Sequence, residues 1–241
     1  MIGILQNDGY GSVVHGHFKE VVRLGWGGAK SNLLPGAVLW VLGIILVISY
    51  YQVQAVEEML DRLGEFKLAS SPWFGIISTA LFGSLIPWIV QAVFLKGADK
   101  QPFRHVPWLL LFWGIHGWQV DWLYRIQAGL FGNGIDFMTI LKKTLVDEFV
   151  WVPFLAVWQL VLGYLLIEKK GSLLEFRAAL KKKPFLDRAI PLMIANWVVW
   201  IPAVSLIYLF PLPLQLPLMN IILALWCLIL TFFAKNVEAT E

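Results

Sequence analysis

The stretch FWGIHGWQVDWLYRIQ, residues 112–127, places ionisable side chains inside an otherwise apolar and aromatic run. At helical spacing His116 and Gln119 share one face, and Asp121 and Arg125 share roughly the opposite face. Ionisable groups at membrane depth are costly, so either pair could line a hydrated path for ions or small solutes. The alternative is structural: Asp121 and Arg125 neutralise each other near the interface, while the Trp and Tyr residues of this stretch form an aromatic belt.

A second group of polar residues lies in LKKTLVDEFVWVP, residues 141–153, just before an apolar run that begins at Phe149. Lys143 and Asp147 lie one helical turn apart, and Asp147 with Glu148 leads directly into this run. The carboxylates could form a channel mouth, although the helix dipole alone also favours them at a helix start. In NWVVWIP, Asn196 is a further polar candidate because an amide can bond a backbone carbonyl that Pro202 leaves free. The indole N–H groups there are expected to anchor at the headgroup level.

Two short patterns raise an enzymatic alternative. EEMLDR, which begins at Glu57, and FWGIH, which ends at His116, resemble the EExxxR and FxxxH motifs of intramembrane CAAX-type prenyl proteases, where Glu and His activate a water. That chemistry needs another histidine from a later helix, and the sequence has none after His116. Glu57 and Glu58 also neighbour other acidic residues, which favours a solvated helix face. We therefore expect no enzymatic activity, no metal and no cofactor, and keep the protease as a remote alternative.

The composition predicts the fold class. The chain is 59% hydrophobic and 15% charged, and its mean hydropathy is +0.70, which is too apolar for a water-soluble domain. Crossing a hydrocarbon core takes about 20 apolar residues as a helix. We predict an all-α, polytopic integral membrane helix bundle, with the lipid bilayer as its partner. About six transmembrane or re-entrant helices are expected, at 33–51, 73–95, 106–124, 150–167, 190–210 and 214–233.

The distribution of charge predicts the orientation of this single membrane domain. Most of the 19 basic residues fall in segments that share a side with both termini, so both termini are expected on the cytoplasmic or matrix side. The basic residues are dispersed and the net charge is only +3, which gives no reason to expect a nucleic-acid partner. The expected parts are an N-terminal segment (1–32), an extra transmembrane helix and loop (33–71), the main membrane domain (72–234) and a C-terminal tail (235–241).

Two further patterns concern packing and the membrane surface. Gly75, Thr79 and Gly83 recur every fourth residue, a small-residue stripe that predicts close packing with another helix. Residues 171–188 place apolar side chains on one helical face ahead of three lysines. This segment is either an interfacial helix among anionic headgroups or a solvated basic loop.

Short motifs recur in a fixed order along residues 72–233. They are a Pro-Trp pair before a span, a Trp-Tyr pair near the end of the next, a basic pair followed by an acidic pair and a proline, and an Asn-Trp pair followed by Trp and Pro. This order resembles the Mpv-seventeen family of peroxisomal and inner-mitochondrial membrane proteins, which includes Sym-one. The residues that carry the resemblance are Pro72, Trp73, Trp122, Tyr124, Lys142, Lys143, Asp147, Pro153, Asn196, Trp197, Trp200 and Pro202.

The resemblance implies a small polytopic protein of a bacterial inner membrane, a mitochondrial inner membrane or a peroxisomal membrane. It implies a weakly selective channel or transport-related protein for small solutes or ions, or alternatively a non-conducting scaffold or stress-response protein. Glu148 stands where the family has Gln, Ile201 separates the last Trp from its Pro, and the helix at 33–51 is extra. We therefore expect a divergent member, and its solute and any homo-oligomeric state stay open.

Overall fold

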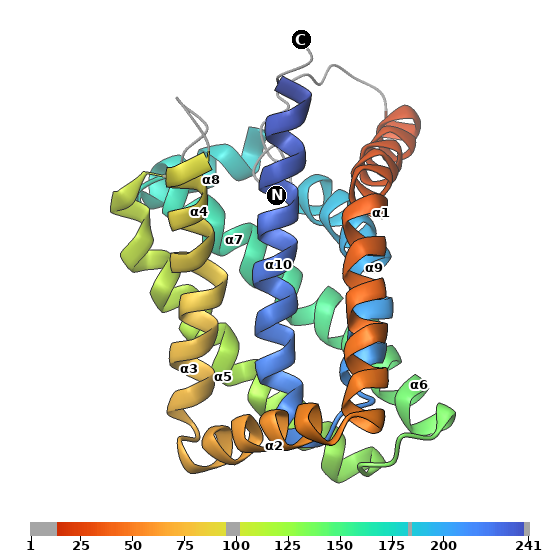
Figure 1. The fold of residues 1–241 in the computed structure, drawn as a ribbon. Coiled ribbons are helices and arrows are strands. Elements are labelled where there is room, and N and C mark those ends of the chain that lie inside the picture. Colours follow the sequence, from red (N-terminus) through yellow and green to blue (C-terminus); the bar gives the residue numbers. More distant parts are fainter. Residues whose placement is uncertain (1–13, 95–101, 183–184, 239–241) are drawn as a thin grey trace. The chain divides into compact units, whose positions relative to one another are not determined.

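The computed structural model describes residues 14–94, 102–182 and 185–238, and every regular element in this part of the chain is a helix (Figure 1). The all-α prediction is therefore confirmed. Four helical runs are long and apolar enough to cross a membrane: Lys19–Gln52, Trp73–Val93, Phe137–Glu168 and Phe185–Ile207. Of the six predicted spans, four coincide with these runs, and the spans at 106–124 and 214–233 lie in further helices.

Short connections join most of the helices. Residues 1–13 of the predicted N-terminal segment and residues 239–241 of the predicted tail lie outside the described residues. In chain order the helices are α1 (Val14–Gln52), α2 (Gln54–Ala69), α3 (Trp73–Ala80), α4 (Ile86–Phe94), α5 (Val106–Phe131), α6 (Phe137–Val146), α7 (Val157–Glu168), α8 (Leu173–Lys182), α9 (Phe185–Ile207) and α10 (Leu212–Glu238).

Two wider π-helical segments interrupt the apolar runs, and a proline accounts for each. Leu81–Leu85 joins α3 to α4 just before Pro87, and Asp147–Ala156 joins α6 to α7 and contains Pro153. A proline has no N–H to donate, and its ring clashes with the carbonyl four residues earlier. The backbone relieves this by shifting locally to the wider i→i+5 hydrogen-bond pattern.

The chain divides into two compact units. Unit 1 contains residues 1–37 and 145–202, and unit 2 contains residues 38–144 and 203–241. Helices α1, α6 and α9 contribute residues to both units. Residues 38–71 belong to the same unit as the residues that come directly after them, and the part boundaries expected from the sequence stay a prediction.

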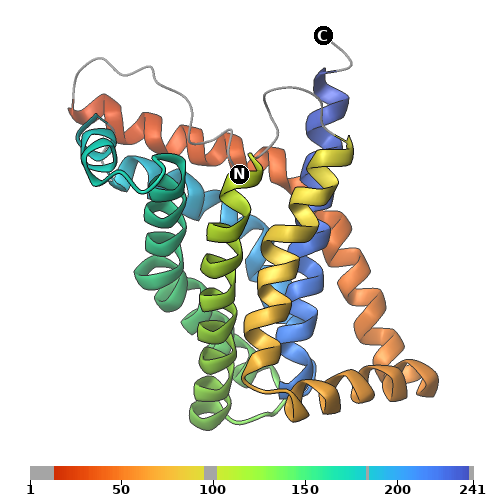
Figure 2. The same ribbon diagram turned by 90° about the vertical axis from the view of Figure 1, so that its left-hand side faces the viewer.

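Close packing between α3 and α5 forms the centre of unit 2. Gly75, Thr79 and Gly83 are all buried, which confirms the packing role predicted for this stripe. A Cβ atom on Gly117 would collide with the Gly75 carbonyl and the Thr79 hydroxyl, so the two backbones are in direct contact there. Figures 1 and 2 both show α10 running alongside this pair. The indole ring of Trp113 covers Gly83 one turn further along.

Helix α2 occupies residues between the predicted spans, where the sequence predicted a charged helix end around Glu57 and a loop after it. It forms because Leu60, Gly64 and Lys67 recur at helical spacing and are buried together, while most of its other residues are exposed. Gly64 packs against Leu214 of α10. In Figures 1 and 2 this helix runs across the ends of α3 and α10 within unit 2. The expected loop is therefore an amphipathic helix whose buried stripe includes a lysine.

The proline-rich region near residue 211 is a tight turn. Helix α9 ends at Ile207 and α10 begins at Leu212, so residues 190–233 form two helices and not one kinked helix. The Gln215 side chain donates its Nε2 hydrogen to the Phe210 carbonyl at 3.0 Å and so closes the turn. Pro213 lies in the first turn of α10, where a missing N–H costs nothing.

Helix α6 of unit 2 begins at an aspartate cap. One carboxylate oxygen of Asp136 accepts hydrogen bonds from the backbone N–H groups of Met138 and Thr139, both at 3.1 Å. The Thr139 hydroxyl donates to the other oxygen at 2.6 Å. These hydrogen bonds stabilise the charged form, and they lower the pKa of Asp136 from its ordinary value.

Unit 1 has its own apolar core. Val152, Val157 and Val161 pack with Ala189 and Leu192, which joins the π-helical segment and α7 to α9. Of the predicted amphipathic segment 171–188, Leu173–Lys182 form α8, in which no residue is buried, and residues 185–188 begin α9. The contact of this segment with lipid headgroups stays a prediction.

Candidate functional site

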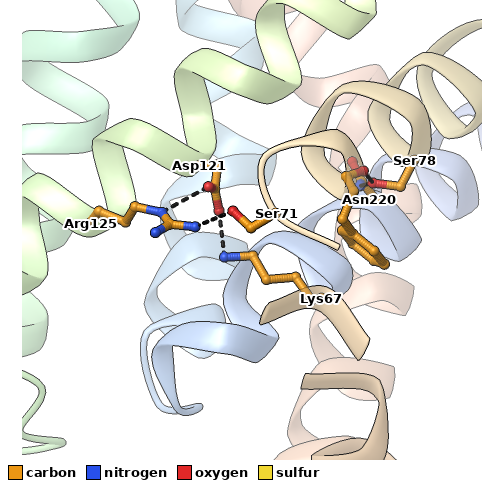
Figure 3. Close-up of polar contacts among 7 residues, drawn as sticks. Lys67, Ser71, Ser78, Asp121, Arg125 and Asn220 are labelled. Carbon is orange, nitrogen blue, oxygen red and sulfur yellow. Dashed lines mark hydrogen bonds and ion pairs between the residues drawn. The ribbon is translucent and has the colours of Figure 1, made fainter. Parts of the chain in front are cut away.

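The first buried polar cluster, which we call the Asp121 cluster, lies where α2, α3 and α5 meet in unit 2 (Figure 3). Lys67 Nζ lies 2.5 Å from Asp121 Oδ1, and Arg125 Nε lies 2.9 Å from Asp121 Oδ2. Arg125 also donates an Nη2 hydrogen to Ser71 Oγ at 2.5 Å. The Asp121 carboxylate therefore bridges two cations and fixes α2 to α5.

The side chains of the Asp121 cluster differ in solvent exposure. The side chain of Lys67 is 2% exposed and that of Asp121 is 10% exposed, whereas that of Arg125 is 43% exposed. A buried ammonium group is stable only with a counter-ion, and Asp121 supplies it. The local pairing of Asp121 with Arg125 was predicted and is confirmed. Lys67 was missed, although a lysine on the buried Leu60–Gly64 stripe was the signal that could have found it.

His116 and Gln119 lie on the opposite face of α5 from Asp121, as the spacing predicts. The half-buried His116 ring stacks on Phe112, with 6.4 Å between centroids, and meets the Trp113 ring edge-on at 5.3 Å. The Gln119 Oε1 atom is buried and has no hydrogen-bond partner within the described residues. These two residues therefore do not join the Asp121 cluster.

A neutral polar pair lies beside the Asp121 cluster, between α3 and α10 (Figure 3). Asn220 donates an Nδ2 hydrogen to Ser78 Oγ at 2.9 Å, and Ser78 donates to the Phe74 carbonyl at 2.5 Å. Asn220 and Thr79 are 1% and 0% exposed. In the described part of the chain, Asn220 Oδ1 and Thr79 Oγ1 have no hydrogen-bond partner. The packed centre of unit 2 thus keeps unused hydrogen-bonding capacity.

A second buried cluster in unit 2, the Tyr208 cluster, joins α5, α6 and the end of α9. Gln127 donates an Nε2 hydrogen to the Tyr208 hydroxyl at 3.0 Å. Lys143 Nζ lies 5.6 Å from the centroid of the Tyr208 ring, within the range of a cation–π contact. The hydroxyls of Thr144 and Ser205 lie 3.1 Å apart. Lys143 and Gln127 are only 1% and 0% exposed, so this lysine is an interior residue.

In unit 1, Trp197 compensates for a proline. Its indole Nε1–H donates to the backbone carbonyl of Glu148 at 2.9 Å. In the π-helical pattern the partner of that carbonyl is the nitrogen of Pro153, which carries no hydrogen. The indole takes the place of the missing N–H, while its ring packs on Phe149. The indole N–H of Trp197 is therefore bonded within the protein, and the headgroup anchoring expected for the indoles of this stretch stays a prediction.

The carboxylates of the same segment are buried. Asp147 is 6% and Glu148 is 1% exposed, and Glu148 Oε2 has no hydrogen-bond partner among the residues that the structure describes. Asn196 is half-buried in α9. Lys143 belongs to unit 2 and Asp147 to unit 1, so their pairing at i, i+4 stays a prediction.

The remaining motif residues are divided between surface and interior. Trp73 is exposed. Of the predicted belt residues, Trp118 and Trp122 are exposed, whereas Tyr124 is buried and meets the Tyr208 ring edge-on at 5.6 Å. Trp113 is also buried, so the belt prediction is wrong for Trp113 and Tyr124. Among the other motif residues, Pro72 directly precedes α3, and Trp200 and Pro202 are half-buried in α9.

Comparisons of the chain with protein families, curated proteins and solved structures give no match. Within the described residues, no three His, Cys, Asp or Glu side chains are grouped so that they could hold a metal ion. Glu57 and Glu58 of the protease-like pattern are exposed on α2, while His116 packs among aromatic rings on α5. The polar clusters of the two units therefore carry the functional argument.

Proposed function

We propose that this chain is a multi-pass integral membrane protein that gives small solutes or ions a weakly selective path through the helices of unit 2. The observation that carries the proposal is the distribution of polarity in that unit. Large apolar side chains such as Ile45, Ile77 and Leu111 are about half exposed, while Lys67 and Asp121 are buried. A surface of this kind suits lipid, and polar groups enclosed by it are the usual lining of a membrane path.

The unused polar atoms at the centre of unit 2 support the same proposal. Asn220 Oδ1 and Thr79 Oγ1 are buried without partners among the described residues. A buried polar atom without a partner costs free energy, and a passing solute, an ion or its water can satisfy it. The resemblance of the motifs to the Mpv-seventeen family agrees with this reading, and we propose divergent membership of that family on this basis.

The proposed location is a bacterial inner membrane, a mitochondrial inner membrane or a peroxisomal membrane, with both termini on the cytoplasmic or matrix side. The lysine-rich α8 segment supports this orientation, because basic residues are retained on that side. A second candidate function, a non-conducting scaffold or stress-response protein, is favoured by the direct contacts of Lys67 and Arg125 with Asp121. A closed ion pair holds helices together without any need for water.

The test is single-channel conductance and solute release from liposomes that contain the purified protein. We expect conductance from the natural chain, and a lower conductance from Asn220→Leu because an apolar side chain would replace a polar lining group. Asn133→Leu is the matched control, since Asn133 is exposed in the loop before α6. Absence of conductance and release from folded protein would abandon the channel in favour of the scaffold.

The location of the path is tested separately. Replacement of the two buried carboxylates described for unit 1, by Asp147→Asn with Glu148→Gln, should leave the conductance of unit 2 unchanged. A conductance that responds to this double replacement and not to Asn220→Leu would move the path to unit 1.

A further inference from the structure

The interior of unit 2 carries more positive than negative charge. Among the described residues of this unit, the buried ionisable side chains with a formal charge are Lys67, Lys143 and Asp121. Asp121 is already shared between Lys67 and the half-exposed Arg125. One buried ammonium group, that of Lys143, therefore lacks a carboxylate partner within the described part of its own unit.

The surroundings of Lys143 are polarised but uncharged. Its Nζ lies over the ring of Tyr208, whose hydroxyl accepts a hydrogen bond from Gln127. The adjacent residue, Thr144, shares a hydrogen bond with Ser205. An aromatic face stabilises a cation only weakly, whereas burying an unpaired charge carries a much larger free-energy cost. The ring alone therefore does not offset the burial of this lysine.

We infer that Lys143 is a binding site for a small anion, such as chloride, inorganic phosphate or a small carboxylate, inside unit 2. The anion would supply the missing counter-charge beside the Tyr208 cluster. Anion binding at Lys143 requires no conduction. If unit 2 conducts, as the proposed function states, this site gives its path a preference for anions over cations, and that part of the inference rests on the proposed function. The protein groups that could neutralise Lys143 instead are the buried carboxylates of Asp147 and Glu148, about one helical turn later in the chain and part of unit 1.

The experiment measures thermal unfolding of the full chain in detergent at constant ionic strength. Chloride, inorganic phosphate and succinate are titrated in turn against a bulky anion such as gluconate. We expect the midpoint of the natural chain to rise with at least one small anion and then saturate, as ligand binding to the folded state requires. Lys143→Met should raise the apparent dissociation constant by about tenfold or more, because it removes the charge that attracts the anion.

Lys142→Met is the matched control, because it makes the same chemical change at the exposed neighbouring position. It should bind the anion as the natural chain does. Lys143→Gln is a second variant for the case in which Lys143→Met does not fold. Equal anion dependence in the natural chain and in a folded Lys143 variant would overturn the site, and so would a natural chain with no anion-specific rise.

Asp147→Asn and Glu148→Gln, made singly and together, test the competing counter-ions. We expect all three variants to leave anion binding unchanged. Anion-dependent stabilisation that arises only in one of these variants would show that a carboxylate of unit 1 neutralises Lys143 and would overturn the inference. The two proposals fail separately: anion binding without conductance contradicts only the channel, and conductance without anion binding contradicts only the Lys143 site.

Discussion

The hydrogen bond from Trp197 to the Glu148 carbonyl allows a sharp test of the fold of unit 1. Trp197→Phe keeps an aromatic ring on Phe149 but removes the N–H group. The carbonyl that faces Pro153 in the π-helical pattern then has no donor. An unsatisfied buried carbonyl costs about 1–3 kcal/mol, so we expect the free energy of unfolding to fall by about this amount.

The proline provides a rescue that separates the N–H from the ring. Pro153→Ala restores a backbone N–H at the position that the carbonyl faces, so the indole is no longer its only donor. In the Pro153→Ala background, Trp197→Phe should therefore cost about 1–2 kcal/mol less than in the natural chain. The assay is reversible unfolding by SDS in mild detergent, monitored by far-ultraviolet circular dichroism. This signal reports helix content and depends little on the number of indole rings, so it is comparable between the Trp and Phe variants.

Trp122→Phe is the control, since Trp122 is 61% exposed and should change stability by less than about 0.5 kcal/mol. The reasoning is refuted if Trp197→Phe costs the same in both backgrounds, because the loss would then come from ring packing. It is also refuted if Trp197→Phe costs no more than Trp122→Phe.

Two further predictions concern unit 2, with unfolding free energy as the measured quantity. Asp121→Asn should cost about 3–5 kcal/mol because it leaves Lys67 buried without its counter-ion, whereas Lys67→Met should cost less than half as much, since Asp121 keeps Arg125. Equal losses would contradict this asymmetry. Gly117→Ala should cost about 1–3 kcal/mol by overpacking, while Gly129→Ala, with open space around it, should cost nothing. A harmless Gly117→Ala would refute the close packing of α3 on α5.

Local patterns in the sequence predicted the features that depend on neighbouring residues. The apolar runs located the helices because the transfer of a segment from water to hydrocarbon depends on the composition of that segment alone. The Asp121–Arg125 pair and the small-residue stripe from Gly75 were predictable because residues three or four apart share a helical face. The stripe did not identify Gly117 as its partner, since nothing in the sequence states which helices pack together.

The features that were missed depend on contacts between residues far apart in the chain or on a change of the backbone hydrogen-bond pattern from α-helical to π-helical. Lys67 pairs with Asp121 because α2 continues as a helix to Ala69 and packs near α5, and no pattern within residues 54–69 indicates which helix their buried face meets. No local pattern indicated that the Trp197 indole donates to the Glu148 carbonyl, because that carbonyl faces Pro153 and lacks a backbone donor only in the π-helical pattern. The division into two units also has no local signature, since it separates residues within single helices.

The π-helical segment from Asp147 to Ala156 changes how positions along this membrane-length run must be counted. Each i→i+5 turn holds more residues than an α-helical turn, so the face that a residue presents lags progressively behind a 3.6-residue period. An accessibility scan with single cysteines, read as one uninterrupted α-helix from Phe137 to Glu168, would therefore assign the wrong face to positions after Ala156. The correct reading is a phase shift across the proline-containing segment, with an ordinary helical period resuming in α7.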